Sequence, residues 1–335
     1  MVRKTRHSIL YSTAYNRNDG SPLYYFNQLR KLPDTEVLHL TPEHDLRGFG
    51  KFDYTWVVDW GEDALLGREK ALALPMPPHA GKTIYIASDT HLDDGYRYNK
   101  ALQFDYVFFN QLHALDEYKR ILRGVNVTDK KVVVLTPEGT KPRKQLVHYL
   151  PHAAEPQAYP HFNTLKKYDL CFIGHMQEYH KGNGINLPRI DVLDYMFRKF
   201  PNFYFGSRNG AFPEKNMFED AAKRFCESRI VFNISVGNDA NMRFFETLIT
   251  GSFLLTNRIP ELKNLEAYGF KDGIHYAAYE TLEDAEEIAK YYIDHEDERE
   301  VIAKRGYEQA LKTGTYKSRI EEVLKIVSGG DINGI

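Results

Sequence analysis

Cysteine is scarce in this sequence, and long apolar runs are missing from it. The chain has 335 residues and only two cysteines, Cys171 and Cys226. Cys171 falls in an apolar, strand-like run and Cys226 in a helix-like run. We therefore expect two buried free thiols, which are typical of a protein in the reducing cytoplasm. Neither cysteine belongs to a Cys/His spacing that indicates a metal site, and we expect no metal.

The chain also lacks an excess of charge of one sign. Its 44 Lys and Arg residues oppose 46 Asp and Glu, giving a formal net charge of −2. Charge therefore gives no general reason to expect binding to nucleic acid or to an anionic membrane. No stretch of about 18 apolar residues is present, so no membrane span is predicted. The basic N-terminal segment leads into a short apolar run that is not typical of a signal peptide.

Short apolar runs alternate with helical patterns along the chain. We expect strands near 8–12, 36–40, 54–59, 83–88, 105–110, 131–135, 170–175, 202–206, 230–235, 252–256 and 274–279. We expect helices near 22–31, 97–102, 112–123, 188–199, 217–228, 281–293, 298–312 and 316–327, besides the one discussed next. This alternation predicts an α/β fold with parallel, doubly wound sheets.

A proline-containing stretch at 150–156 interrupts the pattern and suits a linker. The prediction is thus two Rossmann-like domains, 1–153 and 154–315, that face each other across a cleft. Residues 316–335 would form a crossover helix that packs back on the first domain, and a frayed tail.

The segment 238–251 is the most informative part of the sequence. It has the pattern of a helix that ends at Gly251 and leads directly into a buried strand, after another strand at 230–235. This strand–loop–helix–strand unit places a loop at the carboxyl end of a strand, where open α/β sheets bind ligands. Arg243 and Glu246 share one face of the helix, near an N-terminus suited to phosphate. The alternative is a surface ion pair between these two side chains.

Several motifs, in this order, resemble one enzyme family. They are Ala87-Ser88-Asp89-Thr90-His91-Leu92, Phe104-Asp105-Tyr106-Val107-Phe108-Phe109, Arg243-Phe244-Phe245-Glu246, Gly251-Ser252-Phe253-Leu254-Leu255-Thr256, Arg305-Gly306 and Thr315-Tyr316-Lys317-Ser318-Arg319. Together they resemble glycosyltransferases of the two-Rossmann (GT-B) fold, and more narrowly the CgeB-like, spore-maturation group.

The resemblance implies roles for residues of the second domain. In retaining enzymes of this fold, two glutamates commonly hold the donor, and the second binds ribose hydroxyls. Glu246 and Gly251 match the second position, whereas the first falls on Asn238, which departs from the pattern. The candidate donor-binding residues are Gly174, His175, Gly237, Asn238, Asp239, Asn241, Arg243 and Glu246, together with Arg208, which follows the carboxyl end of a predicted strand.

The first domain contributes two further groups of candidate residues. Asp89 and His91 follow an apolar strand and are candidates for the general base at the reacting centre. The alternative is an Asp that caps a helix beside a solvated His. The loop Asp19-Gly20-Ser21, followed by Pro22, is a candidate contact to acceptor or phosphate, although turn chemistry alone also explains it.

The sequence therefore predicts a metal-independent glycosyltransferase with a nucleotide sugar as co-substrate and no other cofactor, and the family motif favours a retaining mechanism. A UDP-sugar is the favoured donor. The acceptor is a saccharide, a protein, a small molecule or, less readily, modified DNA. The rival hypotheses are a nucleotide-sugar 2-epimerase of the same fold and a module that binds nucleotide or sugar without chemistry.

Overall fold

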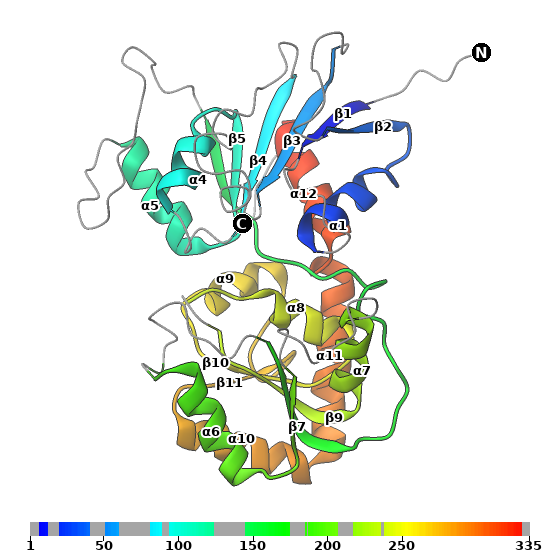
Figure 1. Cartoon of the computed structure of the whole chain (residues 1–335), viewed down its shortest axis with the longest axis vertical. Coiled ribbons are helices and arrows are strands. Elements are labelled where there is room, and N and C mark those ends of the chain that lie inside the picture. The colour runs from blue at the N-terminus through cyan, green and yellow to red at the C-terminus, as the bar shows by residue number, and fades with distance from the viewer. Residues whose placement is uncertain are drawn as a thin grey trace. The chain divides into compact units, whose positions relative to one another are not determined.

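The chain divides into two compact units in a computed structural model. Unit 1 comprises Met1–Pro151 and Ile320–Asp331, and unit 2 comprises His152–Arg319 and Ile332–Ile335. The structure describes residues 7–12, 20–40, 51–59, 81–88, 94–123, 145–174, 185, 187–206, 217–235 and 238–329. Each unit is an α/β unit built on a parallel sheet (Figure 1).

Unit 1 contains a six-stranded sheet in the order β2-β1-β3-β4-β5-β6. Its strands are β1 (His7–Ser12), β2 (Thr35–Leu40), β3 (Tyr54–Asp59), β4 (Lys82–Ala87), β5 (Tyr106–Phe109) and β6 (Leu146–Tyr149), and all neighbours pair in parallel. Its helices are α1 (Ser21–Leu29), α4 (Asp94–Ala101), α5 (Leu112–Leu122) and most of α12 (Tyr316–Val327). Every residue of β3 is buried, as expected where a parallel sheet is covered on both faces.

Helix α12 joins unit 1 through the last turn of the helix. Lys82 Nζ, at the start of β4, donates a 2.6 Å hydrogen bond to the carbonyl oxygen of Val327. Tyr106 OH donates to the same oxygen at 3.4 Å. A cation at the carboxyl end of a helix compensates its dipole and satisfies a carbonyl that has no partner within the helix.

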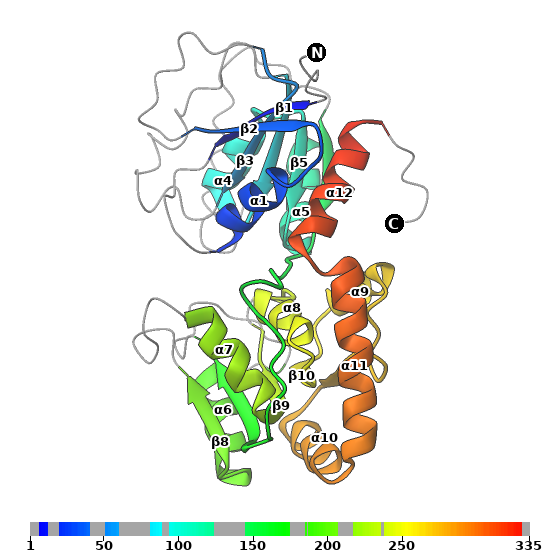
Figure 2. The ribbon, with the colours of Figure 1, turned by 90° about the vertical axis from the view of Figure 1, so that its right-hand side faces the viewer.

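Unit 2 contains a five-stranded parallel sheet in the order β11-β10-β9-β7-β8. Figure 2 shows its strands β8, β9 and β10 together with helices of the same unit. Its strands are β7 (Tyr168–Ile173), β8 (Phe203–Gly206), β9 (Ser228–Asn233), β10 (Leu254–Asn257) and β11 (Ala277–Tyr279). Its helices are α6 (Arg189–Lys199), α7 (Met217–Cys226), α8 (Met242–Ile249), α9 (Leu262–Leu265), the 3-10 turn η2 (Glu266–Tyr268), α10 (Leu282–Asp294) and α11 (Glu296–Thr313). Chain order reverses between β7 and β9, so the topological switch point of the sheet lies there.

Most expected elements are present within a few residues of their predicted bounds. Thr281 is the N-cap of α10 and forms a capping box with Asp284. Cys171 and Cys226 are buried free thiols, and burial raises the pKa of Cys171 to about 12. The sequence did not predict β6 or α9, and the expected strand at 131–135 lies outside the described residues.

The described helices include none that combines the length and the apolar character needed to cross a membrane.

Candidate functional site

The carboxyl edge of the unit 2 sheet is the edge at which its parallel strands end. Arg243, in the first turn of α8, lies at this edge over the switch point. Its Nε donates to the carbonyl oxygen of Ile173 at the end of β7, at 2.6 Å. Its Nη1 donates to Oδ1 of Asn233 at the end of β9, at 2.8 Å. One guanidinium therefore links the two strands between which open α/β sheets form their ligand crevice.

Two neighbouring residues shape the space around this guanidinium. Its central carbon lies 4.4 Å from the centroid of the Phe172 ring, within the range of a cation–π contact. A Cβ atom at Gly174 would lie only 1.8 Å from Nη2 of Arg243. The sequence analysis placed Gly174 among the donor-binding residues. In the structure, the lack of a side chain there makes room for Arg243.

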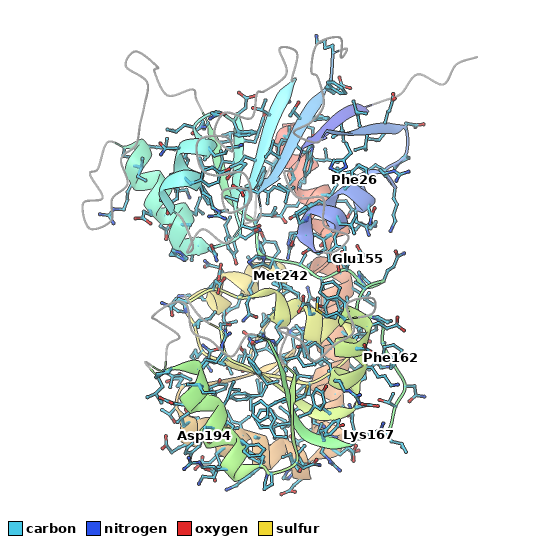
Figure 3. The ribbon with its side chains drawn as sticks, viewed as in Figure 1. Phe26, Glu155, Phe162, Lys167, Asp194 and Met242 are labelled. Atoms are coloured by element: carbon cyan, nitrogen blue, oxygen red, sulfur yellow. The ribbon has the colours of Figure 1, made fainter. Side chains whose placement is uncertain are left out.

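Helix α8 begins with a capped N-terminus at this edge. Asn241 is the N-cap, and its Oδ1 accepts from the backbone N–H of Phe244 at 3.3 Å. Its Nδ2 donates to Oδ1 of Asn233 at 3.3 Å. The helix ends as predicted at Gly251, whose φ of +74° is easily adopted by glycine. Figure 3 shows the side chains around Met242, the first residue of α8.

The described part of the loop before α8 is fixed by a buried carboxylate. Glu261, which follows β10 and is 1% exposed, accepts a 2.5 Å hydrogen bond from the backbone N–H of Ala240. Asn238 has a φ of +58°, and Asp239 is buried. Asparagine adopts this left-handed conformation more readily than most residues. The backbone therefore gives a physical reason for an asparagine at position 238, where the resemblance led us to expect a glutamate.

Glu246 lies one turn after Arg243 and is only 2% exposed. Its burial excludes the alternative of a solvated surface ion pair with Arg243. A buried carboxylate in the middle of α8 accepts hydrogen bonds in a setting with little competing water.

Sequence reasoning missed a set of polar residues at the ends of β9 and β10. Asn233 Nδ2 donates to Thr256 Oγ1 at 3.0 Å, and the backbone N–H of Ser235 donates to Asn257 Oδ1 at 2.7 Å. All four side chains are at most 1% exposed. The available signal was that Asn233 and Asn257 are polar residues that end apolar strands, a pattern that also fits ordinary turns.

A second arginine lies near the same strand ends. Arg189, the first residue of α6, donates from Nη2 to the carbonyl oxygen of Ile234 at 3.0 Å. Its guanidinium carbon lies 5.8 Å from the centroid of the Phe172 ring. The Phe172 ring therefore has two arginine side chains near it.

The structure brings together only part of the predicted site. Gly174, Asn241 and Arg243 are linked as described, and Asn238, Asp239 and Glu246 belong to the same loop and helix. In unit 1, Gly20 accepts the first helical hydrogen bond of α1 from Tyr24, and α1 starts at Ser21. The remaining predicted residues lie outside the described residues: Asp19, Asp89, His91, His175, Arg208 and Gly237.

Within the ranges given above, the structure contains no group of three or more His, Cys, Asp or Glu side chains arranged to hold a metal ion.

Comparison with protein families gives a match in the second half of the chain. Residues 199–325, which run from the end of α6 into α12, match the model of the family described as Glycosyl transferase-like. This part of the chain is therefore a glycosyl transferase-like domain. This match contains the whole of α8 and therefore both Arg243 and Glu246. A search of curated proteins finds no match for the chain.

Comparison with solved structures shows the fold of the whole chain. The structure of Anabaena HepE in complex with UDP and glucose has a TM-score of 0.61 at 10% identity, covering 96% of this chain and 99% of that one. The N-terminal domain of Candida albicans trehalose-6-phosphate phosphatase has a TM-score of 0.61 at 9% identity, covering 98% of each chain. Sucrose-phosphate synthase from Thermosynechococcus elongatus has a TM-score of 0.56 at 10% identity, covering 96% and 98%. The chain thus has the predicted two-domain GT-B fold, and the narrower CgeB-like assignment stays a prediction.

Proposed function

We propose that this glycosyltransferase transfers a sugar from a UDP-sugar donor to a hydroxyl-bearing acceptor, without a metal ion. Unit 2 binds the donor and unit 1 binds the acceptor. The observation that carries the proposal is the position of Arg243 and the N-terminus of α8 at the switch point of the unit 2 sheet. UDP is favoured because structures of the similar HepE protein contain UDP with glucose and UDP-glucose.

The leaving diphosphate is the group that most needs stabilisation in such a reaction. Negative charge develops on it as the bond to the sugar breaks, and preorganised donors aimed at that charge lower the barrier. Arg243 offers a planar guanidinium whose orientation is fixed by two hydrogen bonds. The N-terminus of α8 adds N–H groups and the positive end of the helix dipole.

Glu246 is assigned to the ribose of the donor. A buried carboxylate accepts hydrogen bonds from two neighbouring hydroxyls, and such bonds to a charged group are stronger than neutral ones. The loop 237–241 is assigned to the sugar, where Asn238 offers an amide in place of a carboxylate. His175 and Arg208 are assigned to the diphosphate from the sequence alone. Retention of the anomeric configuration is the outcome that we propose, on the match of Glu246 to the family motif.

The acceptor side of the reaction is assigned to Asp89 and His91. Both follow β4, and carboxyl ends of parallel strands form the ligand-binding edge of such sheets. One of the two removes the proton from the acceptor hydroxyl while the other orients it. The loop of Asp19, Gly20 and Ser21 follows β1, beside the switch point of the unit 1 sheet, and is assigned to acceptor or phosphate.

A ligand panel with product analysis tests the proposal. The protein is melted with UDP, GDP, TDP, CMP and their sugars, and the same samples are analysed by mass spectrometry. A ligand at 100 times its dissociation constant raises the free energy of unfolding by about 2.7 kcal/mol. We expect stabilisation by UDP and its sugars, and glycosylated product when saccharide, protein, small-molecule and DNA acceptors are added.

Other outcomes of the panel contradict the proposal in different ways. Epimerised donor in the absence of acceptor identifies an isomerase. Stabilisation without turnover over the whole acceptor panel identifies a binding module. Stabilisation by another nucleotide family refutes the choice of UDP, and no stabilisation by any nucleotide refutes the donor site.

A further inference from the structure

Asn233 is the residue through which several parts of the unit 2 edge are connected. It ends β9 and its side chain is fully buried. Its Oδ1 accepts from Arg243 Nη1 at 2.8 Å and from Asn241 Nδ2 at 3.3 Å. Its Nδ2 donates to Thr256 Oγ1 at 3.0 Å and to Ser235 Oγ at 3.3 Å. The amide therefore uses both of its donors and accepts twice, which is the full capacity of this group.

The chemistry of the partners fixes which way the amide faces. A guanidinium only donates hydrogen bonds, so the atom beside Arg243 must be the oxygen. The amide nitrogen then faces the two hydroxyls, which accept. A flipped amide would place its NH₂ group against the guanidinium and leave donors facing donors. The hydroxyl of Thr256, directly opposite Asn233 in the parallel register of β9 and β10, thus holds the orientation in which Asn233 meets Arg243.

The same contacts restrict the guanidinium. Arg243 is held at Nε by Ile173 and at Nη1 by Asn233, and its Nη2 lies beside Gly174, where a Cβ atom would be 1.8 Å away. The Ile173 bond alone allows the guanidinium plane to rotate about that contact. The Asn233 bond removes this freedom, and fixed orientation is what makes a forked cation effective toward phosphate oxygens.

We propose that Asn233 is a positioning residue that orients Arg243 toward the diphosphate of the donor, and that Thr256 holds the amide of Asn233 in the required orientation. This inference rests on the proposed function, because it presupposes a nucleoside diphosphate at the switch point. Asn233 acts through Arg243 and does not touch the substrate. Its loss weakens the binding of ligands that carry a diphosphate and spares ligands that lack one.

Calorimetric titration with UDP and with uridine tests the proposal in the full-length protein. Asn233→Ala should weaken UDP binding by about tenfold, equivalent to about 1.4 kcal/mol, with uridine binding unchanged. Thr256→Val, which keeps Asn233 and the shape of the side chain, should weaken UDP binding less but with the same selectivity. Thr256→Ser keeps the hydroxyl, so UDP binding in this variant should return from the level of Thr256→Val to that of the wild type. Kinetics of the same variants should show the loss in kcat more than in KM, because the contact strengthens as charge develops.

Ser252→Ala provides the matched control. Ser252 is as buried as Thr256, belongs to the turn before β10 and accepts from the hydroxyl of Thr250 at 2.9 Å. Its removal deletes a buried hydroxyl at the opposite end of β10 and should change neither affinity. A purely structural role of Asn233 predicts equal losses for UDP and uridine, a result that overturns the inference. Unchanged UDP binding in both Asn233→Ala and Thr256→Val also overturns it.

The wild-type titration separates this inference from the proposed function. If the wild-type protein binds neither UDP nor uridine, the UDP-dependent function fails, and the inference fails with it. If the wild-type protein binds UDP and the variants lose no selectivity for it, only the role of Asn233 is refuted.

Discussion

The two sheets share a strand order around their switch points, yet the described residues at their carboxyl edges differ in charge. Unit 1 runs β2-β1-β3-β4-β5 and unit 2 runs β8-β7-β9-β10-β11, which is the same order relative to the chain. In unit 1, Asp59 ends β3 and its buried carboxylate accepts from the hydroxyl of Tyr85. In unit 2, the corresponding β9 ends at Asn233, which accepts from a cation.

This difference shows what topology decides and what it leaves to side chains. The strand order determines where a crevice forms, because neighbouring connections leave the switch point in opposite directions. The polar residues at the strand ends determine which charge that crevice favours. An edge built around Arg243 suits an anionic diphosphate, whereas the corresponding strand of unit 1 ends at a buried carboxylate, that of Asp59.

The largest effect is expected from unit 1. Asp89→Asn and His91→Ala should each reduce turnover by about 10²- to 10⁴-fold, the usual contribution of a general base. Donor affinity should stay unchanged, because these residues are assigned to the acceptor side. Steady-state kinetics with calorimetric donor binding measures both quantities. Asp93→Asn in the same segment is the control, and loss of donor binding alone would move Asp89 and His91 into the donor pocket.

In unit 2, Arg243→Ala should reduce kcat/KM by about 10²- to 10³-fold, the cost of removing one preorganised donor from a developing anion. Arg243→Lys should recover little, since an ammonium cannot reproduce the two fixed bonds to Ile173 and Asn233. Arg198→Ala, which removes an exposed arginine paired with Asp194, serves as the control. Wild-type kinetics in Arg243→Ala would remove the main distinction between the two edges.

Glu246→Ala should weaken donor binding by about 1.5–3 kcal/mol, the scale of hydrogen bonds to a charged group. The expected loss is in binding of nucleosides as well as nucleotides, because the assigned contact is to the ribose. Titration with uridine and UDP tests this directly. Glu287→Ala, at an exposed position of α10, is the control. A folded Glu246→Ala protein with normal affinity for both ligands would exclude Glu246 from the donor site.

Substitutions at two glycines of unit 2 should affect different quantities, one the free energy of unfolding and the other the affinity for the donor. A Cβ atom at Gly306 would lie 2.4 Å from the backbone oxygen of His275 and 2.8 Å from Leu248. Gly306→Ala should therefore lower the free energy of unfolding by about 1–3 kcal/mol, as overpacking does. In Gly174→Ala the new Cβ meets the end of the Arg243 side chain, which can move. The loss in donor-binding free energy should therefore exceed the loss in the free energy of unfolding. Urea unfolding and UDP titration of both variants give the comparison, and the reverse pattern would contradict it.

The smallest effect concerns Glu286, on α10. Hydrogen bonds from Lys290, Tyr195 and Lys199 lower the pKa of Glu286 to about 2, from an ordinary value of 4.5. Because the folded state holds the pKa down, the stabilisation is complete above pH 4.5 and is lost as the pH falls toward 2. Glu286→Gln should thus reduce stability slightly at neutral pH, and the difference from wild type should shrink on acidification. Urea unfolding over a pH series measures it, and a difference that grows in acid would refute the assignment.

Much of the fold could be predicted from local pattern, because parallel strands and amphipathic helices differ in period. The segment 238–251 also predicted a helix and its glycine end correctly. β6 was missed because it is short and only partly buried, so no periodicity marks it. The site was less accessible to sequence reasoning. The contacts of Arg243 join residues far apart in the chain. The role of Asn233 depends on Thr256 in the neighbouring strand, and the sequence does not show that these two residues are paired.

The attachment of α12 has a consequence for how the protein is made. The first segment of unit 1 precedes unit 2, but unit 1 is completed by residues that follow the main segment of unit 2 and that are anchored by Lys82 at Val327. A ribosome therefore finishes the N-terminal unit last. Unit 2 has its main segment available for folding while the sheet of unit 1 still lacks the helix that closes it. Truncation from the C-terminus would thus damage the half of the protein that was synthesised first.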